Sequence, residues 1–428
     1  MKFSTKPMDL PADLIADIVS RLPAKSVVRF RCVSKLWRTV IADPSLIRAH
    51  LNREIIRKNP NRLLLMYSED PPSVTYEYGY SVRFALTSPE ELINLDPAFR
   101  YSESVNLESP FPLFKLMNFS HPLTRTWFND LKLVGSCNGV VCLSVLFFFG
   151  QLSMHPLSNP HTNIYLWNPS IMECRTLPFA SHDYKKFRLV YIAFGFDALN
   201  EDYKVVKIVY IYDVEAYEVE VYSLKRDSWK KIGNGSASLQ CQYMYYSNQV
   251  VVNGSPHWIV NSGGEKKWPP FIVSFDMADE VFCEMSLPDS SMFFGHTCVG
   301  LVEGWLSVVS YLASWKCEVW VMKEYGVVQS WTRQYVIAEK SVIYSLDRPL
   351  GLLDSGELLL GKWNGGLMLY DPKSTRVEKF GTSMGPFLCQ VATYMESLVS
   401  VMPVKQPSWM DGKHHVKQGT KRMKITAF

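Results

Sequence analysis

Residues 9–41 read DLPADLIADIVSRLPAKSVVRFRCVSKLWRTVI, and this stretch decides how the chain begins to fold. Two Leu-Pro elements stand twelve residues apart, and a Val-Ser-Lys-x-Trp element follows them. Apolar residues recur at helical spacing over 10–22, and a proline then ends that helix. Shorter helical patterns cover about 26–31 and 34–42, and an Asp-Pro pair stops the last of them. The stretch predicts a small N-terminal domain of three or four short helices.

The apolar side chains of this small domain exceed what its own helices can hide. About 45 residues bury too little surface for a full core, and each large aliphatic side chain left in water forgoes roughly 1.5–3 kcal/mol. Either a partner protein completes the apolar surface, or the helices dock on the rest of the chain as an N-terminal cap. Four basic residues near this surface suit an acidic partner: Arg29, Arg31, Lys35 and Arg38.

Charge is unevenly distributed along the 428 residues, which carry a net charge of +4. Residues 1–58 hold 12 Lys/Arg and 5 Asp/Glu, and residues 405–428 hold 6 and 1. The remainder therefore holds 27 basic and 35 acidic residues, a net charge of −8. Basic ends on an acidic body argue against a nucleic-acid groove across the main part of the protein. We expect no nucleic-acid partner.

Nothing in the sequence predicts export or insertion into a membrane. The N-terminus lacks the apolar run of a signal peptide, and the most apolar window, residues 140–150, is about half of a membrane span. The nine cysteines show neither a CxxC pair nor zinc spacing, which is typical of reduced thiols in a core. We expect a protein of the cytoplasm, the nucleus or both, with no membrane partner.

The rest of the chain consists of strand-like segments that repeat. Short runs of Val, Ile, Tyr, Phe and Trp alternate with Gly, Asn, Asp and Pro turns. Aromatic residues that end equivalent segments lie 55, 53, 45 and 50 residues apart; they are Trp167, Tyr222, Phe275, Trp320 and Tyr370. An all-strand period near 50 residues is typical of a propeller blade, with the large aromatics packed between blades. An irregular β-sandwich or barrel is the alternative.

The predicted fold is mainly β with a small α domain. We expect a helical domain at residues 1–58, a β-propeller-like domain of about six blades at 59–402, and a disordered basic tail at 403–428. A final strand at 390–401 would close the ring and remove its open edge. The poorly patterned stretch 87–130 is predicted to be a loop-heavy insertion.

Catalytic chemistry finds no support in the sequence. A G-x-S-x-G elbow, an H-E-x-x-H helix and a phosphate-binding glycine loop are all missing from it. His257 and His296 stand among apolar residues and are interpreted as core or turn residues, and the acidic stretch 198–203 is interpreted as a turn between strands. We expect no catalytic residue, no metal site and no cofactor.

The N-terminal stretch resembles an F-box, because residues 10–41 follow the pattern LPxDLxxxIxxRLPxKSLxRFxxVSKxWxxLI closely. The departures are slight, with Val27 and Val40 where the family often has Leu. The resemblance implies binding to the Skp-type adaptor of SCF ubiquitin ligases and, through it, to a cullin. By position it assigns the adaptor contacts to Leu10, Pro11, Leu14, Ile18, Leu22, Pro23, Val27, Arg31, Val33 and Trp37. Alternatively, some of these, together with Val28 and Phe30, hold the F-box helices together.

The body of the chain resembles the plant family that places an F-box before an F-box-associated interaction domain, which includes the S-locus F-box proteins. The matching pieces run from about 131 to 401 and include LVGSCNGVVCL, YLWNPSIMECRTLP and FGFDALNEDYKVVKI. The kelch label fits loosely, because few glycines are paired. The resemblance implies a non-catalytic subunit that brings an unidentified target protein to the ligase for ubiquitination. The alternatives are a glycan- or small-molecule-binding propeller with a secondary F-box role, and an F-box that acts outside a ligase.

Overall fold

The computed structural model describes residues 10–56, 62–68, 82–87, 105–107, 127–148, 161–179, 187–211, 216–234, 249–260, 270–288, 297–302, 304–312, 316–338, 346–352, 356–362, 367–380 and 390–402. Within these ranges four α-helices precede twenty-four strands. The basic tail from residue 403 lies outside them, and the domain boundaries at 58 and 402 stay predictions.

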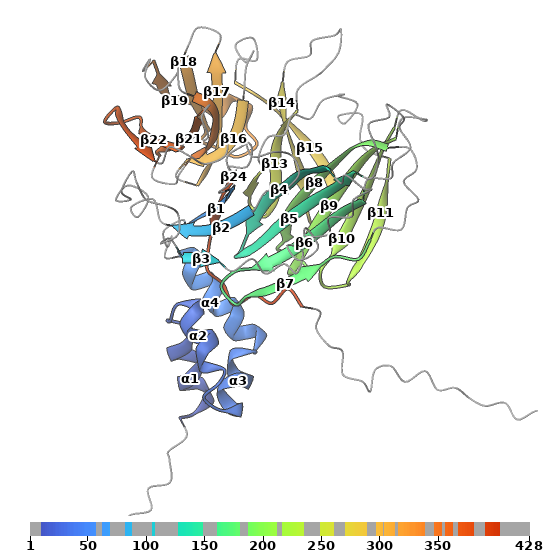
Figure 1. Ribbon diagram of the computed structural model, residues 1–428, viewed down its shortest axis with the longest axis vertical. Helices are drawn as coiled ribbons and strands as arrows, with labels where there is room; N and C mark the ends of the chain where they lie inside the picture. The colour runs from blue at the N-terminus through green and yellow to red at the C-terminus, as the bar shows by residue number, and fades with distance from the viewer. Residues whose placement is uncertain are drawn as a thin grey trace, which may run out of the picture.

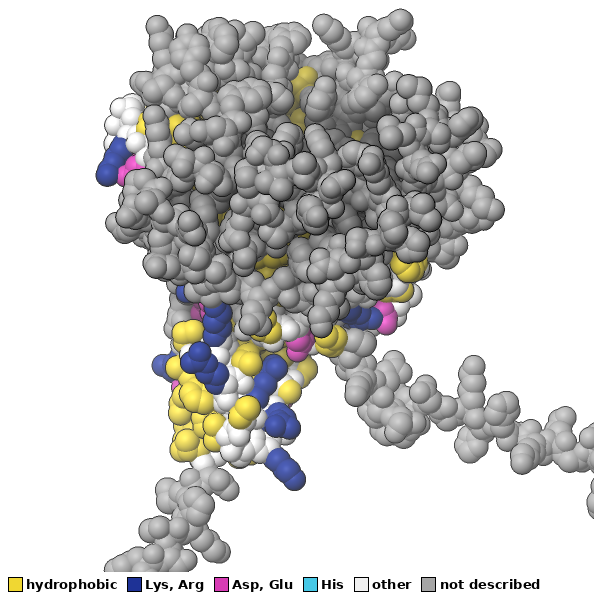
Figure 2. Space-filling model, viewed as in Figure 1, with side chains coloured by type: hydrophobic (Ala, Val, Ile, Leu, Met, Phe, Trp, Pro, Cys, Tyr) yellow, Lys and Arg dark blue, Asp and Glu magenta, His cyan; other side chains and the backbone are white. Residues whose placement is uncertain are grey.

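The helical domain is formed by α1 (Ala12–Val19), α2 (Ala24–Phe30), α3 (Lys35–Ile41) and α4 (Pro44–Ile56). Pro11 and Pro23 stand directly before α1 and α2, where a missing backbone N–H does no harm. Ser34 caps α3, because its side chain accepts a hydrogen bond from the Trp37 amide at 3.3 Å. The prediction of three or four short helices is confirmed with four, although the fourth, α4, is the longest with 13 residues. The domain projects from the β body (Figures 1 and 2).

The β body contains six four-stranded antiparallel sheets, arranged as the blades of a propeller (Figure 1). The prediction of a mainly β fold with about six blades is therefore confirmed. The first blade contains β24 (Gln390–Tyr394), β1 (Arg62–Ser68), β2 (Val82–Thr87) and β3 (Val105–Leu107). The second contains β4 (Trp127–Cys137), β5 (Val140–Phe148), β6 (His161–Asn168) and β7 (Glu173–Thr176). The third contains β8 (Phe187–Asp197), β9 (Asp202–Ile211), β10 (Ala216–Ser223) and β11 (Ser228–Asn234).

The other three blades follow the same order along the chain. The fourth contains β12 (Val250–Val252), β13 (Ser255–Val260), β14 (Phe271–Asp276) and β15 (Val281–Ser286). The fifth contains β16 (Thr297–Val302), β17 (Trp305–Leu312), β18 (Lys316–Met322) and β19 (Trp331–Ile337). The sixth contains β20 (Leu346–Leu352), β21 (Leu358–Lys362), β22 (Leu367–Asp371) and β23 (Arg376–Phe380). The stretch predicted as a loop-heavy insertion, 87–130, supplies β3 and the start of β4, so that prediction is corrected for these residues.

The last strand closes the ring, as predicted. β24 pairs antiparallel with β1, with Tyr394 opposite Arg62 and Val391 opposite Leu65. The first blade is thus built from both ends of the chain, and the open edge of a linear array is removed. β24 ends at Tyr394, earlier than the predicted strand, and residues 395–402 leave the sheet.

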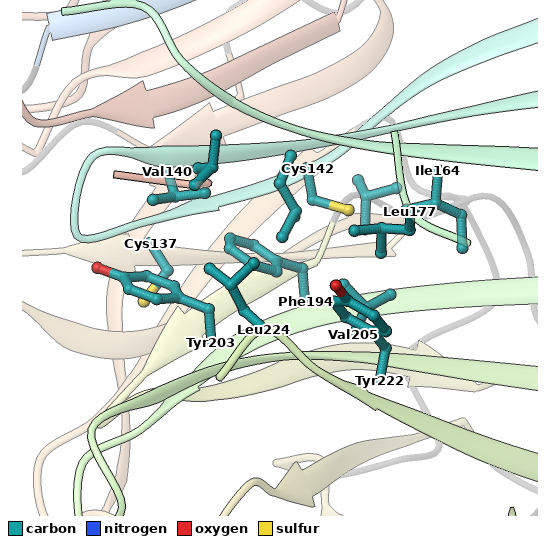
Figure 3. Packing of buried hydrophobic residues seen from close by; sticks show 13 residues of the cluster. Cys137, Val140, Cys142, Ile164, Leu177, Phe194, Tyr203, Val205, Tyr222 and Leu224 are labelled. Carbon is teal, nitrogen blue, oxygen red and sulfur yellow. The ribbon is translucent and has the colours of Figure 1, made fainter. Parts of the chain in front are cut away.

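The repeating aromatics pack between blades. Trp167 is fully buried, and its ring meets Phe84 of the first blade edge-on at 5.2 Å. Phe275 is also fully buried and lies with residues of the preceding blade in one cluster. Tyr222 belongs to the cluster between the second and third blades, where side chains from both sheets interdigitate (Figure 3). The sequence period therefore marks the seams between blades.

Two glutamines join neighbouring blades by a device that the sequence period did not reveal. The amide group of Gln390 in β24 accepts a hydrogen bond from the Leu133 N–H of β4 at 2.7 Å. Gln249, before β12, accepts from the Phe194 N–H of β8 at 3.1 Å and donates to the Phe194 carbonyl at 2.8 Å. Each side chain continues the backbone ladder across a gap between two sheets and satisfies buried backbone groups.

The seven described cysteines differ in burial, with Cys174 intermediate between the buried and the exposed ones. Cys137, Cys142, Cys298 and Cys317 are buried free thiols, as the sequence predicted. Burial raises the pKa of Cys137 and Cys298 to about 12. Cys32 and Cys283 are free but exposed, so the core interpretation is wrong for these two.

Candidate functional site

The first helix of the helical domain has two apolar faces, and only one of them is covered. Ile15 and Val19 are fully buried. Leu14 and Ile18 lie on the neighbouring face of the helix and are 53% and 42% exposed, and Leu10, just before the helix, is 45% exposed. Large aliphatic side chains in adjacent positions at this level of exposure form an apolar surface without a partner in the free chain.

The segment around the start of α3 also carries exposed apolar side chains. Val33 is 60% exposed and Leu36 is 39% exposed. We refer to the exposed side chains Leu10, Leu14, Ile18, Val33 and Leu36 as the open face. Figure 2 shows hydrophobic side chains gathered on the projecting helical domain, with Lys and Arg beside them.

The ten residues assigned to the adaptor contact differ in accessibility. Six are exposed: Leu10, Pro11, Leu14, Ile18, Pro23 and Val33. Leu22, Arg31 and Trp37 are half-buried. Val27 is fully buried among the helices, so a direct contact through its side chain is corrected to a core position in this conformation. Leu36 is exposed but was not among the predicted residues, although it stands next to Trp37 in the sequence.

Part of the predicted set holds the helices together. The rings of Phe30 and Trp37 lie 5.3 Å apart, and both side chains pack against the core of the domain. Val28 packs there too. The alternative that these side chains stabilise the helical domain from within is therefore supported for Val28 and Phe30.

The covered face of the helical domain lies against the propeller. The buried cluster around Ile15 includes two residues from the β body, Ile171 in the turn between β6 and β7 and Leu398 in the segment after β24. Arg48 of α4 reaches Glu201, in the turn between β8 and β9, at 2.8 Å. The helices therefore dock as a cap with one face and leave the open face uncovered. The alternative of docking on the rest of the chain is supported for the covered face, and a partner for the open face stays a prediction.

The buried face of α4 contains polar residues that the sequence reading missed. His50 is fully buried, and its Nε2 lies 2.9 Å from the carbonyl oxygen of Leu22. A carbonyl can only accept, so Nε2 carries the proton and donates. Glu54 is also buried. No apolar period marks these positions, which is why they were not expected in the core.

Charged residues lie on the same helical domain as the open face (Figure 2). Arg21 donates to Asp17 at 2.8 Å, and this hydrogen bond holds the pKa of Asp17 below its ordinary value. Arg29, Lys35 and Arg38 are exposed. Exposed cations around an apolar centre give the polar rim of a protein–protein contact and favour an acidic partner.

His257, which was considered as a catalytic base, is a buried structural residue. His257 is fully buried; its Nδ1 donates to the Ser255 carbonyl at 2.9 Å, and its Nε2 lies 2.8 Å from the Tyr325 hydroxyl. Burial lowers the pKa of His257 to about 4, so the ring is neutral and Nε2 accepts from the tyrosine. The interpretation of His257 as a core residue is supported, and His296 lies outside the described residues.

The acidic stretch 198–203 forms a turn, as interpreted from the sequence. The Asp197 carboxylate accepts from the Asn200 backbone and side chain at 2.9 and 2.8 Å. Asp202 accepts from the Lys225 amide at 2.8 Å. Among the described residues, no group of three or more His, Cys, Asp or Glu is arranged to hold a metal ion, and no helix there is long and apolar enough to cross a bilayer.

Fold and site together define a propeller that carries a small helical domain with one uncovered apolar face. The pattern of the F-box domain matches residues 8–48, and that of the F-box associated beta propeller domain matches residues 101–401. The chain therefore belongs to the family of F-box proteins with an F-box associated beta propeller domain.

Proteins of Arabidopsis thaliana resemble the chain over most of their length. The F-box protein At3g07870 is 29% identical over 85% of this chain and 85% of its own. The F-box protein CPR1 is 28% identical over 91% of this chain and 88% of its own. The F-box/kelch-repeat protein At3g23880 is 26% identical over 92% of this chain and 96% of its own. The shared region includes both the helical domain and the propeller.

Proposed function

We propose that this protein is a substrate-recognition subunit of an SCF-type ubiquitin ligase. In this role the open face binds a Skp-type adaptor, and through it a cullin, while the propeller holds a target protein for ubiquitination. The observation that carries the proposal is the open face itself: large aliphatic side chains stay exposed on a domain whose other face is already docked on the propeller.

The energetics of the open face support a partner. Full burial of a large aliphatic side chain is worth roughly 1.5–3 kcal/mol, and each of the five side chains is about half exposed, so covering them yields roughly 4–7 kcal/mol. The basic rim adds an electrostatic preference for an acidic partner and raises the rate of association. The free chain obtains neither contribution.

The strand connections favour a target site at the end of the propeller away from the helices. Connections alternate between the two ends of an antiparallel blade. Ile171 and Glu201, which meet the helical domain, both lie in four-residue turns at one end. The strands of these blades run from that end to the opposite end of the propeller, away from the helical domain. We therefore infer that target recognition takes place at the opposite end.

The chemical contribution of such a subunit is proximity. Holding a target lysine near a ubiquitin-charged enzyme makes the transfer effectively intramolecular. No catalytic group is required of the chain itself. The free thiols at the seven described cysteines fit a reducing compartment, the cytoplasm or the nucleus.

The proposal is tested by separating the two binding functions in cells. The intact chain and the double variant Leu14→Asp/Ile18→Asp are each used to capture bound proteins under proteasome inhibition. We expect the intact chain to capture adaptor, cullin and ubiquitinated targets, and the double variant to retain the targets without adaptor and cullin. Val281→Asp, at an exposed position in β15, is the control. Equal capture of adaptor by both variants would count against the proposal.

A further inference from the structure

The segment after β24 lies between the helical domain and the propeller. Residues 395–402 follow the closing strand and pass along the second blade next to α4 (Figure 1). We refer to these residues as the strap. The strap belongs to neither a helix nor a sheet, yet several of its side chains are buried. Its contacts are therefore the reason for its fixed path.

One strap residue belongs to the core of the helical domain. Leu398 is fully buried in the cluster formed by Ile15, Val19 and neighbouring side chains of the F-box helices. Leu398 and Ile171 are the two buried residues that the β body contributes to that cluster. A side chain more than 300 residues away in the sequence thus completes the hydrophobic core of the N-terminal domain.

The strap is attached to the propeller by hydrogen bonds at its start. The Asn168 side-chain amide donates to the Ser397 carbonyl at 3.1 Å and to the Val399 carbonyl at 2.8 Å. The Tyr394 hydroxyl lies 2.7 Å from the Ser170 hydroxyl and donates to the Asn168 side chain at 3.1 Å. These groups are buried, so the bonds are protected from competition by water.

Further contacts fix the end of the strap to the second blade and to the core between the second and third blades. Glu173 accepts from the Ser400 hydroxyl at 2.6 Å and from the Val401 amide at 3.2 Å. Val401 is fully buried in the core between the second and third blades. At Gly139 the strap approaches so closely that a Cβ would overlap the Ser397 hydroxyl. An extended chain presents successive side chains to opposite sides, and here Leu398 faces the helices while Val401 faces the propeller.

We propose that the strap fixes the orientation of the F-box on the propeller and that Leu398 is its positioning residue. Two other contacts join the domains: Ile171, at the edge of the same buried cluster, and the exposed ion pair between Arg48 and Glu201, which contributes little. Small interfaces between domains allow relative motion by default. A buried leucine on a segment anchored to the propeller at both ends suppresses that motion. The fixed orientation itself does not depend on the proposed function. Its consequence does, because a fixed orientation sets where the target lies relative to the adaptor.

The protein offers two native labelling sites for a direct test. Cys32 lies in the helical domain and Cys283 in the fourth blade, and both thiols are exposed. Spin labels on them, in a full-length chain carrying Cys241→Ser and Cys389→Ser, report the distance between the two domains. We expect one narrow distance distribution in this parent, and a distribution about twofold broader or more in Leu398→Asp, because the domains then move independently.

Control variants keep the test decisive. Leu199→Asp makes the same chemical change at an exposed turn position of the same end of the propeller and should leave the distribution narrow. Leu398→Ala is the milder variant for the case that Leu398→Asp does not fold, and it should broaden the distribution as well. Far-ultraviolet circular dichroism verifies that the helices stay formed. A distribution as narrow as the parent's in a folded Leu398 variant would overturn the proposal.

The consequence for ubiquitin transfer is measured separately. In a reconstituted ligase, we expect the lysines of the propeller that receive ubiquitin to be few in the parent and more widely spread in Leu398→Asp, when the two are compared at equal amounts of adaptor-bound protein. Identical modification patterns would contradict the positioning role. If the adaptor does not bind the parent, the proposed function fails, whereas the distance measurement in the free chain still decides the role of the strap.

Discussion

The adjacent residues Leu14 and Ile15 of α1 should respond oppositely to replacement by alanine. Ile15 is fully buried, so Ile15→Ala leaves a cavity and should lower the local free energy of unfolding by about 2–5 kcal/mol. Leu14 is 53% exposed, so Leu14→Ala removes little that the free chain buries. Alanine is also a good helix former. The two substitutions are a matched pair, since they shorten aliphatic side chains at neighbouring positions of one helix.

Adaptor binding should show the reverse order. Covering the exposed half of Leu14 is worth about 1 kcal/mol, so Leu14→Ala should weaken the adaptor complex by a factor of about five. Leu14→Asp would place a carboxylate in an apolar contact and should weaken it by about tenfold or more. Ile15→Ala leaves the open face unchanged, and its folded population should bind with an affinity within about twofold of the parent.

Two assays separate these effects. Hydrogen exchange of the α1 and α3 amides reports local stability in the full-length chain, and calorimetric titration with the adaptor reports affinity. The reasoning would be refuted if Leu14→Ala lost as much amide protection as Ile15→Ala. It would also be refuted if Leu14→Asp bound the adaptor as tightly as the parent.

Three further predictions concern the propeller. Gln390→Ala leaves the Leu133 N–H of β4 without its acceptor and should lower the free energy of unfolding, measured by thermal unfolding, by about 1–3 kcal/mol. Gln329→Ala, at an exposed position, should not change it measurably. Burial raises the pKa of Cys298 to about 12, so alkylation near neutral pH should modify exposed Cys283 first, and the rate at Cys298 should rise with pH up to that value. Gly139→Ala combines a φ of 79° with overlap on the strap and should lower the melting temperature.

Much of the architecture could be predicted because it is encoded locally. Pro11 and Pro23 delimit the first two helices through their fixed backbone geometry. Aromatic residues recur once per blade because each seam between sheets needs a large side chain, as Trp167 illustrates. These signals act within a few residues or repeat at a fixed period, so one sequence is enough to see them.

The remaining features depend on contacts between distant parts of the chain. Leu14 and Val27 look alike in the sequence, yet Leu14 is exposed and Val27 lies in the core of the helical domain, which Ile171 and Leu398 of the β body complete. The role of Leu398 follows from its position beside helices at the other end of the chain. Gln390 resembles any polar residue of a strand until the neighbouring blade is in place. No local pattern carries this information.

The central claim is that an adaptor completes the open face, and calorimetric titration of a Skp-type adaptor into the full-length chain at several temperatures tests it most directly. The account predicts binding with a negative heat-capacity change, the mark of apolar burial. It also predicts loss of binding in Leu14→Asp/Ile18→Asp but not in Val281→Asp. An absence of binding to the unaltered chain, or undiminished binding by the double variant, would contradict it.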